Sequence, residues 1–299
     1  MLAIGVDIGG THLRTGCVDE RFALTGFTQK PTKDILTGDA PAALARFIGD
    51  YIKRFAGGET VSGVCVGFPA AVDRNRAVVL SAPNVPGFDG LDLKATLQEA
   101  LGVPVIVERD VNLLLTYDIY RHSVPRDAPV IGYYVGTGLG NTILINGRLL
   151  TGHNGVAGEL GHIPAWDKTH PCTCGNTGCV EELVAGKALA ALRAAYYPDT
   201  DIADLFVRHG AEPRVGEYIR HLAIPVAIEV NIIDPSTVIL GGGVIAMRGF
   251  PREKLIEAIK FHARKPQPCG NLTFIFSDNG QQNGVIGAGI TMLKGADAL

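Results

Sequence analysis

Apolar residues along the chain form two alternating patterns, one typical of buried strands and one typical of amphipathic helices. Short, mostly apolar runs bounded by glycine or polar residues predict strands at 2–6, 13–18, 61–67, 103–107, 130–135, 141–145, 237–240 and 272–276. Helical spacing predicts helices at 41–55, 91–101, from near 113, 183–197, 222–232, 251–263 and 284–294, with Pro225 in the first turn of its helix. This repeated alternation of strand and helix indicates an α/β layered fold.

Composition and charge narrow the classes of function. The 299 residues suffice for one large domain or two ordinary ones, and 46% are hydrophobic against 19% charged. A net charge of -3 gives no reason to expect a nucleic-acid or membrane partner. The N-terminal MLAIGVDIGG lacks the features of a secretory signal, and the uncharged stretch 128–147 contains glycines typical of strand, turn and strand. We therefore expect a cytoplasmic protein.

Two units of strand, glycine turn and strand occur in the chain, with DIGGT at 7–11 and GTGLG at 136–140. Glycines let backbone N–H groups approach an anion, the threonines add hydroxyl donors, and Asp7 at a strand end could hold a metal ion. A simple hairpin explains either unit alone. Two copies favour a pair of phosphate-binding turns, while the absence of Walker and Rossmann glycine motifs disfavours those modes of binding.

Polar or glycine-rich segments follow three predicted strands. Asp110, in ERDVN, stands at a strand end where ligands of α/β sheets bind, and its carboxylate could take a proton from a substrate hydroxyl. It could instead cap the following helix. Asn84, in SAPNVPG, is a candidate ligand or only a turn former. The glycines at 241–243 could lie against a flat ligand or form a tight strand-to-helix turn.

The most concentrated chemistry lies at 162–182, which reads HIPAWDKTHPCTCGNTGCVEE. Its three thiols are close enough for one metal site, to which His162 or His170 would add a fourth ligand. A redox pair or buried thiols is the alternative. Thiols clustered in a cytosolic chain favour zinc, and four protein ligands would make that zinc structural. The three other cysteines are expected to be buried free thiols: Cys17, Cys65 and Cys269.

Together, DIGGTHLR, GTGLG, GELGH and CTCGNTGCVE resemble the ROK family of sugar kinases and regulators, over essentially the whole chain. Further segments are most similar to members that phosphorylate D-allose: GFPAAV, SAPNVP, RDVN, NGVAGELGHIP, DLFV, DPSTVILGGGV and FPREKL. The resemblance implies an α/β, two-domain actin-like ATPase (ribonuclease H-like) fold with sugar and ATP in the interdomain cleft. Residues 1–115, completed by a helix at about 284–299, would form the smaller domain, and residues 116–283, with the zinc-binding segment 162–182, the larger.

The resemblance also implies roles for individual residues. Asp110 would be the catalytic base, and Asp7 would serve Mg²⁺. Many family members have Asn where this chain has Arg109, and the allose-phosphorylating members share the Arg-Asp pair. The sugar-binding residues would be Asn84, Arg109, Asp110, Glu159, His162 and Glu181. The ATP-binding residues would be Gly9, Gly10, Thr11, His12, Gly136, Thr137, Gly138 and Gly140 for phosphates, and Gly242 and Gly243 near adenosine. The zinc ligands would be His162, Cys172, Cys174 and Cys179.

The expected function is therefore that of an ATP-dependent hexokinase-type phosphotransferase. It would act on the 6-hydroxyl of an aldohexose, D-allose above others, with ATP and Mg²⁺, a structural Zn²⁺, and a homodimeric assembly. The alternatives are a kinase for glucose, mannose or fructose, a sugar-sensing regulator, or a non-catalytic sugar-binding protein. The regulators carry a DNA-binding helix-turn-helix ahead of the first glycine turn, and with only three residues before Ile4 we do not expect such a domain here.

Overall fold

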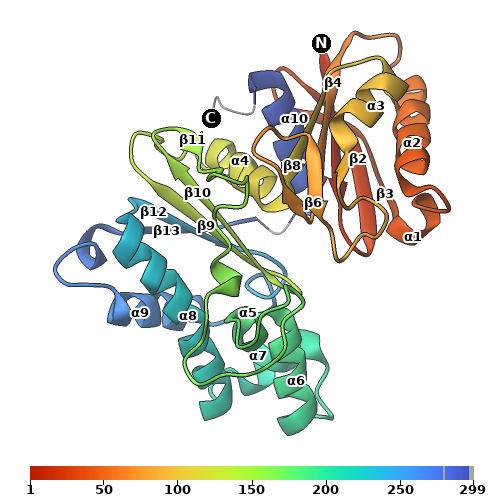
Figure 1. Cartoon of the computed structure of the whole chain (residues 1–299). Coiled ribbons are helices and arrows are strands. Elements are labelled where there is room, and N and C mark those ends of the chain that lie inside the picture. The colour runs from red at the N-terminus through yellow and green to blue at the C-terminus, as the bar shows by residue number, and fades with distance from the viewer. Residues whose placement is uncertain (279, 296–299) are drawn as a thin grey trace. The chain divides into compact units, whose positions relative to one another are not determined.

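The computed structural model describes residues 1–278 and 280–295, which form two compact units, each around its own sheet (Figure 1). The first unit comprises Met1–Pro125, Gly147–Ala157 and the chain from Gly280, and the second comprises Arg126–Asn146 and Gly158–Asn279. The expected boundary between residues 115 and 116 falls inside α4 (Asp110–Arg121). That helix packs along α10 (Asn283–Lys294) and so belongs wholly to the first unit. Residues 296–299 of the expected closing helix lie outside the described residues.

The first unit is a three-layer α/β structure. Its sheet has the strand order β3-β2-β1-β4-β8, in which β1 pairs antiparallel with β2 and parallel with β4, and β4 pairs parallel with β8. Helices α4 and α10 cover one face of this sheet, and α2 and α3 cover the other (Figure 1). The strands and helices not yet bounded are β1 (Leu2–Ile8), β2 (His12–Asp19), β3 (Leu24–Pro31), α1 (Thr32–Ile35), α2 (Ala40–Phe55), β4 (Val61–Phe68), α3 (Leu93–Leu101) and β8 (Val105–Arg109).

Local sequence explains where these helices begin and how closely they pack. Asp39 caps α2 by accepting a hydrogen bond from the Ala42 amide at 3.1 Å, and Asp92 caps α3 through the Ala95 amide at 2.8 Å. Gly5 of β1 lies flush against Val285 of α10, where any Cβ would collide with the Val285 carbonyl. The helices thus cover the central strands β1 and β4, whose residues are mostly buried. A small side sheet joins β5 (Ala71–Val72), β6 (Val78–Ser81) and β7 (Leu91–Asp92).

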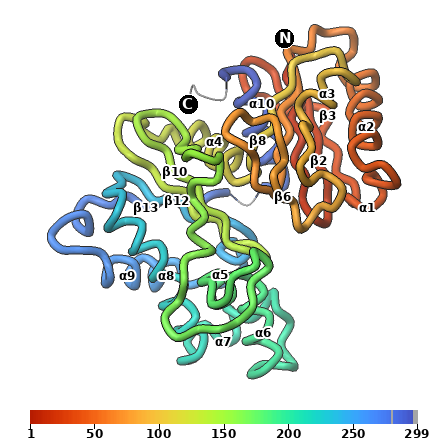
Figure 2. Tube along the Cα trace, in the orientation of Figure 1, coloured from red at the N-terminus to blue at the C-terminus, as the bar shows by residue number. Residues whose placement is uncertain are grey.

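The second unit is built on a sheet of order β11-β10-β9-β12-β13, with α8 and α9 packed side by side (Figure 2). Its core is a cluster of buried apolar residues from the sheet and from helices α5 to α9. The strands of this sheet that lie in the second unit are β9 (Val130–Val135), β10 (Leu139–Ile145), β12 (Thr237–Gly241) and β13 (Thr273–Phe276). The edge strand β11 (Arg148–Leu149) lies in the segment Gly147–Ala157, which is counted with the first unit. The helices and 3₁₀ turns are η1 (Leu160–His162), α5 (Glu181–Val184), α6 (Gly186–Tyr196), η2 (Ile202–Asp204), α7 (Leu205–His209), α8 (Pro213–Ile233), α9 (Arg252–His262) and η3 (Cys269–Asn271).

Two of the expected helices differ from the structure in their extent. Helix α8 begins at Pro213, so Pro225 lies inside it and not in its first turn. Buried Val215, Tyr218 and Ile219 extend the apolar face toward the N-terminus, and this packing outweighs the hydrogen bond that proline removes. The expected helix at 183–197 is split at Ala185 into α5 and α6. Among residues 1–278 and 280–295, no helix is both long and apolar enough to span a membrane.

Candidate active site

The first glycine turn joins β1 to β2 in the first unit. The Gly9 amide donates to the His12 carbonyl at 2.9 Å, so this amide is used to close the turn. Gly10 and Thr11 are exposed at the tip of the turn. Asn84, from the loop after β6, lies beside them, because a Cβ on Gly10 would be 3.5 Å from the Asn84 carbonyl oxygen. The structure therefore brings Asn84 to the turn.

Asp7 lies directly before this turn and faces Arg14 across the β1–β2 pair. The two side chains form an ion pair with 3.3 Å between Arg14 Nη1 and Asp7 Oδ2, and each is 18% exposed. Burial raises the pKa of the Asp7 carboxyl, and the Arg14 guanidinium partly opposes that rise. Arg14 also donates to Gln29 and Gln281. The Asp7 carboxylate keeps an exposed edge, so it fits a role as a ligand of Mg²⁺, directly or through water.

Asp110 is the first residue of α4 and follows β8 directly, because β8 ends at Arg109 and not at Val107 as expected. Its Oδ1 accepts the Val111 amide at 2.8 Å. The N-cap position of α4 is occupied by Arg109, so Asp110 is not the helix cap. The carboxylate therefore stands at the carboxyl end of a parallel strand, where α/β sheets bind ligands.

A buried ionic network that the sequence did not reveal supports this segment. Glu108 is 3% exposed, and its Oε2 accepts from Arg76 Nε at 2.6 Å. Its Oε1 accepts the Arg109 amide at 2.9 Å and Asn112 Nδ2 at 2.8 Å. The network thus holds the backbone amide of Arg109 before Asp110 and the side chain of Asn112 after it. Because Arg76 lies 32 residues away in sequence, no local pattern could have predicted the pairing.

Arg109, an expected sugar ligand, is itself only 7% exposed. Its Nη1 donates to the Ala157 carbonyl at 2.5 Å, within the same unit. Ala157 is the residue before Gly158 and Glu159, so the guanidinium binds the backbone that leads to another expected sugar ligand. In this structure Arg109 therefore anchors a loop.

The second glycine turn joins β9 to β10 in the second unit. The Gly136 amide donates to the Gly138 carbonyl at 3.0 Å, and the Gly136 carbonyl accepts the Gly186 amide at 2.8 Å. Thr137 is exposed between them, and Gly140 lies within β10. The glycine corner after β12 meets this turn, because Gly242, with φ of 92°, lies flush on Val135, the residue before Gly136. Gly243 beside it borders open space.

Glu181 reaches the same turn from α5. Its Oε2 accepts the Leu139 amide at 2.7 Å. A Cβ on Gly138 would lie only 2.6 Å from that oxygen, so a larger residue at 138 would displace the carboxylate. An expected sugar ligand is thus hydrogen-bonded to an expected phosphate-binding turn.

Four side chains of the cysteine segment converge on one point. Their ligand atoms lie within 4.8 Å of one another: His162, Cys172, Cys174 and Cys179. The Sγ atoms of Cys174 and Cys179 are 3.6 Å apart, as are Cys172 Sγ and His162 Nδ1. A zinc tetrahedron with ordinary Zn–S and Zn–N lengths has edges of about 3.6 to 3.8 Å. The arrangement therefore fits zinc, and His170 is not part of it.

His162 presents its two ring nitrogens to different partners. Nδ1 faces Cys172, while Nε2 lies 3.6 Å from Oε2 of Glu159.

Of the cysteines outside the cluster, Cys17 and Cys65 are buried as expected, and Cys269 is only half-buried. Trp166, at 93% exposure, lies on the loop between His162 and the cysteines. The expected site residues thus form two groups, one on each unit.

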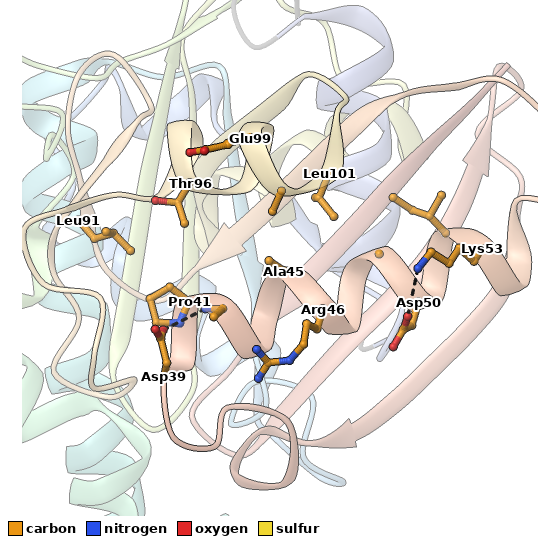
Figure 3. A pocket seen from close by; sticks show the side chains of 14 residues that line it. Asp39, Pro41, Ala45, Arg46, Asp50, Lys53, Leu91, Thr96, Glu99 and Leu101 are labelled. Atoms are coloured by element: carbon orange, nitrogen blue, oxygen red, sulfur yellow. Dashed lines mark hydrogen bonds and ion pairs between the residues drawn. The ribbon is translucent and has the colours of Figure 1, made fainter.

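A cavity of 1020 Å³ lies elsewhere in the first unit, between α2 and α3 (Figure 3). Small or apolar side chains such as Ala45 and Leu101 line it, with Arg46, Asp50 and Glu99 around them. None of the expected site residues borders it, so it is separate from the candidate site.

Comparison with known proteins identifies the family. The ROK family model matches residues 3–294. A glucokinase from Thermotoga maritima is 28% identical over 95% of this chain and 95% of its own length. An N-acetyl-D-glucosamine kinase from Vibrio vulnificus is 29% identical over 97% of this chain and 99% of its own.

A solved structure supports the same relationship. The crystal structure of a ROK family glucokinase from Streptomyces griseus, in complex with glucose and AMPPNP, matches with a TM-score of 0.79. It is 28% identical and covers 97% of this chain and 98% of that one. The prediction of a two-domain actin-like ATPase fold is confirmed. With a family match that spans nearly all of its residues, the chain belongs to the ROK family.

Proposed function

We propose that this protein is an ATP-dependent sugar kinase that phosphorylates the 6-hydroxyl of an aldohexose, with D-allose as the preferred substrate. The observation that carries the proposal is the similarity of nearly the whole chain to proteins named as sugar kinases, one of them solved with glucose and AMPPNP. The preference for D-allose rests on the segments GFPAAV, SAPNVP and NGVAGELGHIP and on the Arg109-Asp110 pair.

In the proposed reaction, the oxygen of the sugar hydroxyl forms a bond to the γ-phosphorus of ATP. The bond from that phosphorus to the β–γ bridging oxygen breaks, and ADP leaves. Asp110 accepts the hydroxyl proton as the oxygen attacks. Its position after β8 and the support of Glu108 beneath it favour this role, because a general base must be held in one place.

Phosphate binding is assigned to the two glycine turns. Exposed Gly10, Thr11 and Thr137 offer amide and hydroxyl donors, whereas the amide of Gly9 is already used inside its turn. Asp7 would hold Mg²⁺, which when bound supplies positive charge against the β- and γ-phosphates. The remaining assigned residues are His12, Gly136, Gly138 and Gly140 for phosphates, and Gly242 and Gly243 for adenosine.

Sugar hydroxyls are assigned to Asn84, Arg109, Glu159, His162 and Glu181. The zinc proposal explains how His162 can serve both metal and sugar, since Nδ1 faces the thiols and leaves Nε2 for a hydroxyl. Zinc bound by His162 with Cys172, Cys174 and Cys179 would be structural and would fix the loop that carries these residues.

A coupled assay that measures ADP release tests the proposal. Allose, glucose, mannose, fructose and N-acetylated hexosamines would be compared, and we expect the highest kcat/KM with allose. A higher value for another hexose would refute the preference alone. If none of these sugars causes ADP release, the kinase proposal is refuted.

Replacing the proposed base gives a second test. Asp110→Asn should lower kcat by about 10²- to 10⁴-fold, because the amide cannot accept the proton, while sugar affinity stays largely intact. Asp50→Asn, at a side chain 79% exposed on α2, is the matched control and should behave as wild type. Near-normal turnover of Asp110→Asn would show that another group is the base.

A further inference from the structure

Lys187 forms ion pairs with two neighbouring carboxylates of the second unit, those of Glu181 and Glu182. It follows Gly186 at the start of α6 and extends its ammonium toward the first turn of α5. Its Nζ lies 3.1 Å from Oε1 of Glu181 and 2.5 Å from Oε1 of Glu182. Partial burial lowers the pKa of this ammonium, but the two carboxylates raise it more, so Lys187 is charged at neutral pH.

The contacts of Glu181 show what this cation does. One carboxylate oxygen accepts the Leu139 amide of the glycine turn, and the other accepts Lys187. An ionised carboxylate has about four lone-pair sites, so two remain for sugar hydroxyls. Glu182 and the thiol of Cys172 have ligand atoms within 4.8 Å of those of Glu181. Lys187 is therefore the cation that offsets negative charge concentrated around Glu181.

We propose that Lys187 is a positioning residue that holds the Glu181 carboxylate in the orientation in which it binds the sugar. This inference rests on the proposed function, in which Glu181 receives sugar hydroxyls. Without the ammonium, two partly buried carboxylates repel each other, and Glu181, only 12% exposed, loses one of its two fixed contacts. The sugar then has to reorder the carboxylate on binding, and its affinity falls.

A direct role in phosphate binding is the competing explanation. Lys187 is next in sequence to Gly186, whose amide binds the Gly136 carbonyl of the glycine turn. Contacts with both acids favour positioning, because they use two of the three N–H donors of the ammonium and already offset its positive charge. The two roles predict different kinetics, since one affects sugar binding and the other affects ATP binding.

The test compares Lys187→Met with wild type in steady-state kinetics and measures sugar binding by calorimetry without ATP. We expect KM and Kd for the sugar to rise about tenfold, the effect of losing a charge-assisted hydrogen bond, and KM for ATP to change less than about twofold. Lys187→Arg keeps the charge and should recover most of the affinity. Glu182→Gln leaves the pair of Lys187 with Glu181 in place and should stay within about twofold of wild type.

The matched control is Lys53→Met, the same substitution at a side chain 81% exposed in the first unit, which should leave all constants unchanged. If KM and Kd for the sugar are unchanged in Lys187→Met, or if only KM for ATP rises, the inference is overturned. Sugar phosphorylation by the wild type in the same experiment would still support the proposed function. A wild type that neither binds nor phosphorylates any sugar would overturn both. If circular dichroism shows that Lys187→Met does not fold, Lys187→Gln decides by the same criteria.

Discussion

Glu229 is a buried acid in the core of the second unit, and its replacement should change how stability depends on pH. It lies on α8 with 5% exposure, and Asn141 Nδ2 donates to its Oε2 at 2.8 Å. Burial raises the pKa of Glu229 to about 8, and the hydrogen bond from Asn141 only partly opposes this rise. Glu229→Gln keeps the shape of the side chain and removes its ionisation.

The sign and size follow from linkage. The folded protein retains a proton that the unfolded chain releases above its ordinary pKa of 4.5, so stability from this group is full below that pH and falls as pH rises toward about 8. Each pH unit in this window lowers the free energy of unfolding by about 1.4 kcal/mol, and the whole window by about 5 kcal/mol. The free energy of unfolding of Glu229→Gln should not show this fall with pH.

Urea unfolding followed by far-ultraviolet circular dichroism measures the effect. Between about pH 5.5 and about pH 7.5, the free energy of unfolding of Glu229→Gln should rise relative to wild type by about 3 kcal/mol. Glu257→Gln, at an exposed position on α9, should run parallel to wild type. A constant difference between Glu229→Gln and wild type across this range would mean that Glu229 ionises normally in the folded protein.

Two further predictions concern the cysteine cluster and the ionic network below Asp110. Cys174→Ser, or removal of metal by a chelator, should raise KM for the sugar more than KM for ATP, because zinc would fix the loop that carries His162. Equal changes in the two KM values would mean that the cluster only supports the fold. Arg76→Met leaves the buried Glu108 carboxylate without its cation and should lower the free energy of unfolding by about 3 kcal/mol in urea titrations. Arg76→Lys should cost less, and no loss in Arg76→Met would show that Glu108 needs no cation.

Patterns confined to one segment predicted much of the fold. The strand at 130–135 is confirmed as β9, because all six of its residues are buried and its sequence is correspondingly apolar. The hydrophobic pattern does not predict strand β3 (Leu24–Pro31), because it lies at the sheet edge with mostly polar, partly exposed residues. It forms because β2 offers unpaired backbone groups, which a sequence pattern does not record. The expected helix at 222–232 is shorter than α8, because Pro225 favours a helix start whereas packing of the residues before it extends the helix to Pro213.

In the candidate site, too, local motifs predict some residues, whereas the partners of those residues lie elsewhere in the fold. Spacing within a short motif was enough to select the cysteines, whose ligand atoms do converge, and to select both glycine turns. The partners that hold those residues come from elsewhere: Arg76 reaches Glu108, and Lys187 reaches Glu181 across a break between two helices. Such supporting residues depend on how the backbone folds, so their identity alone gives no signal.

The exposure of Trp166 determines how unfolding of this protein can be monitored by intrinsic fluorescence. It is the only tryptophan in the chain, and at 93% exposure its indole ring already meets water in the native state. Tryptophan emission responds mainly to a change from an apolar to an aqueous environment, and here unfolding brings almost none. The spectroscopic record of unfolding should come instead from tyrosines that leave the core, among them Tyr133, Tyr51 and Tyr218.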